Sequence, residues 1–419
     1  MSGSVRVPGD KSVSHRALIF AALARGQSRV RGLLLSDDVR STAGVLRSLG
    51  WPVPEVSDDM RIDGGGLRSP ARAPHGALDC GNSGTTTRLM AGVAAAHPFA
   101  SSFVGDASLS RRPMKRVAAP LEAMGARVEF TEGHEGLPMT IHGGPLRAVE
   151  WLLPVPSAQI KSAVLLAGLC AGVPVRVREP VPTRDHTERM LQAAGADVVT
   201  TDGVISLAPV ASLSATDLQV PGDPSSAAFF VARALLADEG SIRVEQVLRS
   251  PHRDGFLRVV RRMGARMESH ASLHGSGDSS DTLLVHAGEP LRGTEVAAGE
   301  VTSMIDEIPM LAVLAARAEG ETVVRGAEEL RVKESDRIAA VVSNLRAIGV
   351  EAEELPDGFI VRGTRAPLRG HVVTHADHRI AMAFGVLGAS PDCHISMDDP
   401  ACVSVSYPTF WEDLARVAR

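Results

Sequence analysis

Lysine is scarce in this sequence of 419 residues, and the scarcity draws attention to the lysines that remain. Of the 44 basic residues 40 are arginine, and the lysines are Lys11, Lys115, Lys161 and Lys333. An ammonium group is a compact point charge that can give up its proton, whereas a guanidinium stays charged in proteins. Each lysine is therefore a candidate for proton transfer or ligand binding. The alternative is that these lysines remain by chance and have no functional role.

Other features are also absent, and each absence excludes a class of protein. The four cysteines form no C-x-x-C pair and are too few for a disulfide scaffold, so we expect a reducing, cytoplasmic setting. The chain opens without a signal-peptide pattern, and its longest apolar stretch, around Ala163–Leu169, is far shorter than the roughly 20 residues of a membrane span. A net charge of −5 argues against a general nucleic-acid or membrane-surface binder but leaves room for a local basic pocket.

An internal repeat organises the sequence. The string V-P-G-D occurs at Val7–Asp10 and again at Val220–Asp223, each time before an alanine-rich apolar stretch. Within each half a shorter unit recurs, in which an apolar helix, a β-prone run, a polar helix and a second β-prone run follow one another. Five polar helices end at a glycine suited to the left-handed C′ position: Gly50, Gly125, Gly195, Gly264 and Gly349. A shorter sixth unit runs from about His371 to Arg419.

The duplicated halves predict an α/β fold with two similar domains. Because the sixth unit lacks closing strands and the chain begins with a strand-like Ser4–Val7, we expect this N-terminal strand to complete the last unit. The chain would then cross twice between the domains, with residues 9–221 in one domain and residues 1–8 and 222–419 in the other. A double crossing suits opening and closing around a cleft. A stacked solenoid is the alternative, although the period of about 70 residues is long for one.

Each repeat opens with a polar loop before its apolar helix, and these helix N-termini are candidates for an anion site. Free N–H groups and the helix dipole favour anions there. The loops carry cationic and hydrogen-bonding side chains: Lys11, Ser12 and Arg16, then Asn82, Gly84 and Arg88, then Ser157, Gln159 and Lys161, and finally Asp377 and Arg379. N-capping explains the serine, asparagine and aspartate residues equally well, but it does not explain lysine or arginine.

Two further polar segments are candidate functional sites. The first, Gly105–Pro113, is a turn-rich loop with paired arginines, which suit the bidentate capture of a carboxylate or phosphate. The second, Arg331–Arg337, places Lys333 and Arg337 on one face of an expected helix with Glu334 beside them. A solvated helix face with an ion pair is the alternative interpretation of the second segment.

Taken in order, the motifs resemble those of the 5-enolpyruvylshikimate-3-phosphate (EPSP) synthases from end to end. The strings are PGDKSVSHRALIFAALA, CGNSGTTTRL, the RRPM loop, SAQIKSAVLLAGL, TRDHTERML, PGDPSSAAFF, MIDEIPMLAV, RVKESDRI and ADHRIAMAF. The resemblance implies two domains of three β-α-β-α-β-β units each, with the active-site cleft between them. It also implies transfer of the enolpyruvyl group of phosphoenolpyruvate to the 5-hydroxyl of shikimate 3-phosphate, with release of phosphate and without a metal or organic cofactor. We expect a monomer.

The resemblance also implies roles for single residues. Shikimate 3-phosphate would be bound by Lys11, Ser12, Arg16, Ser157, Gln159, Arg184, Asp306 and Lys333. Phosphoenolpyruvate would be bound by Lys11, Gly84, Arg112, Gln159, Arg337 and Arg379. Asp306 would orient and deprotonate the attacking hydroxyl, while Glu334, assisted by Lys11, would deliver a proton to the methylene carbon.

The sequence departs from the family pattern in places, and two alternative functions remain. Val405 stands where many members have a late lysine for phosphoenolpyruvate, so we expect Arg337 and Arg379 to carry more of that binding. Gly84 is the small residue of glyphosate-sensitive members, which implies inhibition by that analogue. One alternative is UDP-N-acetylglucosamine enolpyruvyl transferase, whose mobile loop carries a cysteine that Gly105–Pro113 lacks. The other is a non-catalytic binding relative, although the acidic and lysine positions are kept.

Overall fold

The computed structural model describes residues 2–68, 71–272 and 279–417 of the chain, which forms two compact units. The N-terminal unit is Lys11–Val220, and the C-terminal unit combines Met1–Asp10 with Pro221–Arg419. The chain therefore passes from one unit to the other twice, next to each of the two V-P-G-D segments.

The N-terminal unit combines helices with small sheets. Its helices are α1 (Lys11–Leu23), α2 (Asp37–Ser48), α3 (Gly84–Ala95), α4 (Ala107–Ser110), α5 (Lys115–Met124), α6 (Ala158–Ala171) and α7 (His186–Ala193). Its strands are β2 (Ala24–Arg31), β3 (Asp59–Gly65), β4 (Leu78–Asp79), β5 (Ala100–Val104), β6 (Arg127–Phe130), β7 (Met139–His142), β8 (Val149–Leu152), β9 (Val175–Arg178), β10 (Val198–Thr201), β11 (Val204–Leu207), β12 (Leu213–Ser214) and β13 (Asp217–Gln219).

Two segments of this unit repeat the order β-α-β-α-β-β, one from β4 to β7 and the other from β8 to β11. In both, the first two strands pair in parallel and the last two complete the sheet in antiparallel fashion, giving the orders β4-β5-β7-β6 and β8-β9-β11-β10. In the remaining repeat, which is the first along the chain, β2 pairs antiparallel with β3. It also pairs in parallel with β12 and β13 from the end of the unit. The expected α/β repeat fold is confirmed.

The C-terminal unit is built in the same way. Its helices are α8 (Pro224–Leu235), α9 (Gly255–Arg262), α10 (Ala298–Val301), α11 (Ile308–Ala315), α12 (Arg337–Ala347), α13 (His378–Gly388) and α14 (Phe410–Val417), with 3₁₀ turns η1 (Ile305–Glu307), η2 (Glu328–Val332) and η3 (Pro400–Val405). Its strands are β1 (Ser2–Arg6), β14 (Ser241–Leu248), β15 (Met267–Ser272), β16 (Ser280–His286), β17 (Glu295–Val296), β18 (Glu321–Val324), β19 (Glu351–Leu355), β20 (Gly358–Arg362), β21 (Leu368–Val372) and β22 (Cys393–Met397).

The N-terminal strand completes the fourth repeat, and the expectation that it completes the sixth is wrong. Strand β1 pairs in parallel with β14, in a sheet of order β1-β14-β16-β15 that matches β17-β18-β20-β19. The reason lies in the two V-P-G-D segments, which bind each other: the Asp10 amide donates to the Pro221 carbonyl at 2.7 Å, and the Asp223 amide donates to the Pro8 carbonyl at 2.9 Å. The strand before one segment is thereby held beside the repeat that follows the other. The sixth repeat keeps a two-stranded sheet of β21 and β22.

The five repeat glycines end their helices as the sequence predicts. Gly50, Gly125, Gly195, Gly264 and Gly349 all have positive φ, between 87° and 113°. At each, the glycine amide donates to the carbonyl three residues earlier and the next amide donates to the carbonyl five residues earlier, which is the Schellman pattern. Each polar helix therefore stops at a fixed residue and turns into the strand that follows.

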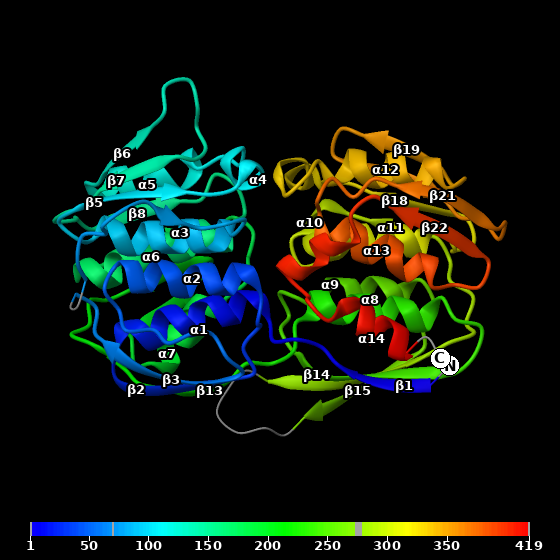
Figure 1. Cartoon of the computed structure of the whole chain (residues 1–419), viewed down its shortest axis with the longest axis horizontal. Helices are drawn as coiled ribbons and strands as arrows, with labels where there is room; N and C mark the ends of the chain where they lie inside the picture. The colour runs from blue at the N-terminus through cyan, green and yellow to red at the C-terminus, as the bar shows by residue number, and fades with distance from the viewer. Residues whose placement is uncertain (1, 69–70, 273–278, 418–419) are drawn as a thin grey trace. The chain divides into compact units, whose positions relative to one another are not determined.

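The first helices of the repeats lie inside the units, as Figure 1 shows, with sheets on the outside. Every residue of α8 and α11 is buried, as expected for α11, whose residues are all apolar. Close packing fixes these helices against one another: a Cβ added to Gly92 of α3 would lie 2.2 Å from the Ala163 carbonyl oxygen of α6. This packing sets the relative positions of the helix N-termini. No described helix combines the length and apolar character that crossing a membrane requires.

Candidate active site

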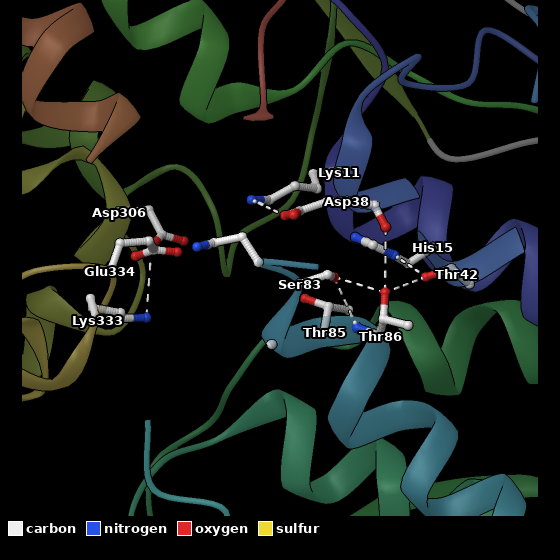
Figure 2. A network of polar contacts seen from close by, with 12 residues as sticks. Lys11, His15, Asp38, Thr42, Ser83, Thr85, Thr86, Asp306, Lys333 and Glu334 are labelled. Atoms are coloured by element: carbon white, nitrogen blue, oxygen red, sulfur yellow. Dashed lines mark hydrogen bonds and ion pairs between the residues drawn. The ribbon is translucent and has the colours of Figure 1, made fainter. Parts of the chain in front are cut away.

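In the N-terminal unit, Lys11 is the first residue of α1 and contacts a carboxylate from α2. Its Nζ lies 3.1 Å from Asp38 Oδ2, and the two side chains are 19% and 7% exposed (Figure 2). One turn further along α1, His15 is fully buried, and burial, reinforced by Lys11 and Arg16, holds its pKa well below 6.5. The start of α1 thus places an ammonium group next to solvent and a neutral imidazole behind it.

The N-terminus of α3 gathers two arginines around a glycine. Ser83 caps this helix by accepting from the Thr86 amide, and Gly84 follows it. A Cβ on Gly84 would lie 2.5 Å from Arg88 Nη1 and 3.3 Å from Arg112 Nη1, so both guanidinium groups lie close to the glycine. Arg112 is buried and donates to Asn82 Oδ1 at 2.7 Å. Two guanidinium groups at a helix N-terminus form a setting that favours an anion.

The N-terminus of α6 joins this cluster through a glutamine. Gln159 accepts from Arg88 Nη1 at 3.0 Å and donates through Nε2 to Thr85 Oγ1 at 2.9 Å. Ser157 is the N-cap of α6, with its hydroxyl accepting from the Ile160 amide at 3.3 Å. The structure therefore brings Gly84, Arg112 and Gln159 together, while the capping interpretation holds for the Ser157 hydroxyl.

Arg16 is buried, and its guanidinium donates to groups on three segments of the N-terminal unit. Its Nε donates to Thr187 Oγ1 and its Nη2 to Ser162 Oγ, both at 2.7 Å, and its Nη1 donates to the Ser12 carbonyl at 3.0 Å. Arg16 thereby ties α1 to α6 and α7. Arg184 is partly exposed in the loop just before α7.

In the C-terminal unit, three cations from two segments surround Asp306 in the turn η1. Lys333 Nζ and Arg337 Nη1 lie 3.7 Å and 3.6 Å from Asp306 Oδ1, and Figure 2 shows the Lys333 contact. Arg379 Nη1 donates to the Asp306 carbonyl at 3.1 Å. Arg337 Nη2 also contacts Glu334 Oε2 at 2.7 Å, so the two candidate acid–base carboxylates share one arginine.

Arg337 is held by a buried carboxylate on its other side. Its Nε donates to Asp377 Oδ2 at 2.8 Å, and the arginine side chain is only 1% exposed. Burial disfavours the charge of Arg337, but Asp377, Glu334 and Asp306 outweigh it and raise the pKa of the guanidinium. Burial likewise opposes ionisation of Asp377, but Arg337 holds the pKa of that carboxyl below its ordinary value. Asp377 also caps α13 by accepting from the Arg379 amide, so one carboxylate orients the Arg337 side chain and fixes the backbone at Arg379.

A second buried arginine fixes the chain next to these residues. Arg253 contacts Asp10 Oδ2 and Asp223 Oδ1, each at 3.0 Å, and donates to Ser225 Oγ at 2.9 Å. Ser225 in turn donates to Glu307, the neighbour of Asp306. Burial works against the charge of Arg253, but the surrounding carboxylates raise its pKa. The turn that carries Asp306 is thus anchored to the V-P-G-D segments.

The order and content of these loops match a known family along nearly the whole chain. Residues 1–414 match the EPSP synthase (3-phosphoshikimate 1-carboxyvinyltransferase) family. The chain belongs to the EPSP synthase family. The resemblance that the motifs predict is confirmed, and the chain is an enzyme of this family.

Individual relatives agree with the family assignment. The chain is 45% identical to the 3-phosphoshikimate 1-carboxyvinyltransferase of Aquifex aeolicus, over all of this chain and 97% of the relative, and 47% identical to that of Xanthomonas campestris, over 98% and 93%. A solved EPSP synthase from Acinetobacter baumannii is 40% identical, with a TM-score of 0.86 over 99% of this chain and 95% of the other. The enolpyruvyl transferase NikO from Streptomyces tendae shares the fold, with a TM-score of 0.74 at 18% identity, over 100% of this chain and 95% of the other.

Two expectations about side chains of the N-terminal unit are wrong in detail. Lys161 does not serve an anion site, because its Nζ contacts Glu179 and Glu188 at 2.9 Å and 2.6 Å in the interior. The paired arginines of the Gly105–Pro113 loop do not act together, since α4 turns Arg111 outward and Arg112 inward.

The segment 331–337 is not one helix. Residues 333–336 link η2 to α12, and Asp336 caps α12 by accepting from the Ala339 amide. Lys333 and Arg337 still meet, but they do so at Asp306.

Asp38, which lies against Lys11, is an acidic residue that the sequence motifs do not single out. Its signal is the pair Asp37-Asp38 at the start of the second helix of the first repeat, which is equally typical of ordinary charges at a helix N-terminus. Among the described residues, no three histidine, cysteine, aspartate or glutamate side chains are grouped to hold a metal ion.

Proposed function

We propose that this EPSP synthase transfers the enolpyruvyl group of phosphoenolpyruvate to the 5-hydroxyl of shikimate 3-phosphate and releases inorganic phosphate. The observation that carries the residue-level proposal is the cluster at Asp306, where two carboxylates are held among three cations. Such a cluster can remove a proton from one substrate and give a proton to another while the cations hold phosphate.

The N-terminal unit supplies most of the anion-binding groups in this proposal. Gly84, Arg112 and Gln159 bind phosphoenolpyruvate, and Lys11 contacts both substrates. Shikimate 3-phosphate is bound by Lys11, Ser12, Arg16, Ser157, Gln159 and Arg184. The substrates bring several negative charges out of water, and cations together with helix N-termini offset that desolvation.

The C-terminal unit supplies the acid and the base. Glu334, assisted by Lys11, protonates the methylene carbon of phosphoenolpyruvate, which makes the adjacent carbon electrophilic. Asp306 accepts the proton of the 5-hydroxyl as its oxygen attacks that carbon. In the tetrahedral adduct the Glu334 carboxylate takes a proton back from the methyl group, and the C–O bond to phosphate breaks, which restores the double bond and leaves the enol ether and inorganic phosphate. Lys333 contacts shikimate 3-phosphate, and Arg337 and Arg379 hold phosphoenolpyruvate and the departing phosphate.

We propose further that the two compact units are the domains expected from the sequence, with residues 9–221 in one and residues 1–8 and 222–419 in the other. The protein works as a monomer in the cytoplasm on these two small substrates, with neither nucleic acid nor membrane as a partner. The net charge of −5 supports the last point, because it gives no general attraction to polyanions.

Phosphate release tests the proposal. The purified protein should release phosphate from phosphoenolpyruvate with shikimate 3-phosphate but not with UDP-N-acetylglucosamine. Lys11→Arg should lower kcat by at least about 100-fold, because the larger fork keeps the charge but does not give up a proton. Lys115→Arg is the matched control, since Lys115 lies in an exposed pair with Glu135. Release with the UDP-sugar, or a normal rate for Lys11→Arg, would reject the proposed substrate or the proposed role of Lys11.

A further inference from the structure

Asp38 is a buried carboxylate, and its contribution to the stability of the fold does not explain why it is there. Its Oδ2 contacts Lys11 Nζ at 3.1 Å, while its Oδ1 is buried and has no hydrogen-bond partner among the described residues. A buried acceptor without a partner costs free energy. The neighbouring Asp37 is exposed in the same first turn of α2, so the favourable charge at that helix N-terminus does not require Asp38.

A chain of hydrogen bonds holds Asp38 in place from behind. Thr86 Oγ1 donates to the Asp38 carbonyl at 3.4 Å, and Thr86 also contacts Thr42 Oγ1 at 2.6 Å and Ser83 Oγ at 2.8 Å. Thr42 Oγ1 contacts His15 Nδ1 at 2.6 Å. Figure 2 shows this chain running from α1 through α2 to α3. It links the N-terminal halves of the three helices that carry Lys11, Asp38 and Gly84.

From this geometry we propose that Asp38 is a positioning residue that holds the Lys11 ammonium at the place where it meets the substrates. The proposal rests on the proposed function of Lys11. A four-carbon lysine stem samples many rotamers, and an ion pair with a carboxylate that is itself fixed by the backbone selects among them. Asp38 is thus retained for function at a cost in stability, as is common at active sites.

Substitution of Asp38 separates positioning from folding. Asp38→Ala should lower kcat about 10- to 100-fold, because a displacement of about 1 Å at a reacting group has an effect of that size. Asp38→Asn should fall between it and the wild type, since its side-chain oxygen can still accept from Lys11. The melting temperature should stay within a few degrees of the wild-type value. Asp37→Ala, in the same turn, is the matched control and should keep the wild-type kcat.

A double-mutant cycle on the Kd of shikimate 3-phosphate provides the second readout. In the wild-type background Asp38→Ala should weaken binding. In a Lys11→Met background the same change should leave binding unchanged or tighten it, because Asp38 then faces an anionic ligand with its charge uncompensated. Equal weakening in both backgrounds would show that Asp38 acts independently of Lys11, and a wild-type kcat in Asp38→Ala would equally overturn the assignment.

The outcome for Asp38 is distinguishable from the outcome for the proposed function. If wild type and Asp37→Ala both release phosphate, the activity stands whatever Asp38 does. If the wild type releases none with shikimate 3-phosphate, the proposed function fails first, and the binding cycle then reports on the pairing of Asp38 with Lys11 alone.

Discussion

Removing the ammonium of Lys161 should destabilise this protein more than any exposed lysine substitution would. Lys161 lies between Glu179 and Glu188, with side chains 1%, 6% and 5% exposed. The Thr183 hydroxyl also donates to the Glu179 carboxylate, so the loop that carries Arg184 is held by the ion pair of Lys161. Lys161→Met keeps the length of the side chain and leaves two carboxylates buried without their cation.

The size of the loss follows from burial. Breaking a buried ion pair by removing one partner costs about 3–5 kcal/mol, because the remaining charge stays desolvated. An exposed pair contributes only about 0–1 kcal/mol. For a unit of about 200 residues a loss of about 3–5 kcal/mol corresponds to a fall in melting temperature of about 6–20 °C. Lys115→Met is the matched control, since Lys115 and Glu135 are 2.7 Å apart but 67% and 61% exposed.

The loss should also depend on pH. Burial raises the pKa of Glu188 in the folded protein, and Lys161 opposes that rise. Without Lys161 the pKa of Glu188 rises further above its unfolded value, so the folded state is penalised at neutral pH and recovers as the pH falls toward about 4.5. Melting by circular dichroism at pH 7 and pH 5 should show a smaller gap between Lys161→Met and wild type at the lower pH. A shift at pH 7 no larger than that of Lys115→Met would refute the reasoning.

Two further predictions concern a histidine and a glycine. Burial lowers the pKa of His97 to about 4. Between pH 6.5 and 4 the unfolded chain therefore binds a proton at this histidine that the folded protein does not bind. The free energy of unfolding should fall by up to about 3 kcal/mol as the pH drops through this range. His97→Phe keeps the stacking on Phe99 and should melt with a weaker acid dependence; an unchanged slope would contradict this. Gly84→Ala places a methyl group against Arg88 and Arg112, and should raise the KM for phosphoenolpyruvate several-fold more than that for shikimate 3-phosphate, measured by phosphate release; equal changes would count against the glycine's proposed role.

The sequence by itself determined the features that depend on neighbours along the chain. The five repeat glycines end their helices because a Schellman turn involves only about six consecutive residues. Ser83, Ser157, Asp223 and Asp377 cap the helices that follow them for the same local reason. The repeat count and the family motifs are likewise written in the order of residues, so the fold and the family could be predicted.

The tertiary structure alone decided which distant groups meet. Strand β1 could close any repeat with a free edge, and the contacts between the two V-P-G-D segments selected β14. Lys11 and Lys161 both lie in the first turn of apolar helices, and packing places Lys161 against two buried carboxylates, Glu179 from the loop after β9 and Glu188 from α7. Asp37 and Asp38 are the same residue type at adjacent positions of α2. Because they lie on different faces of the helix, Asp38 is buried against Lys11 and Asp37 is exposed. Whether a charged side chain forms a buried ion pair or stays in solvent depends on packing between elements far apart in sequence, so no local sequence pattern predicts it.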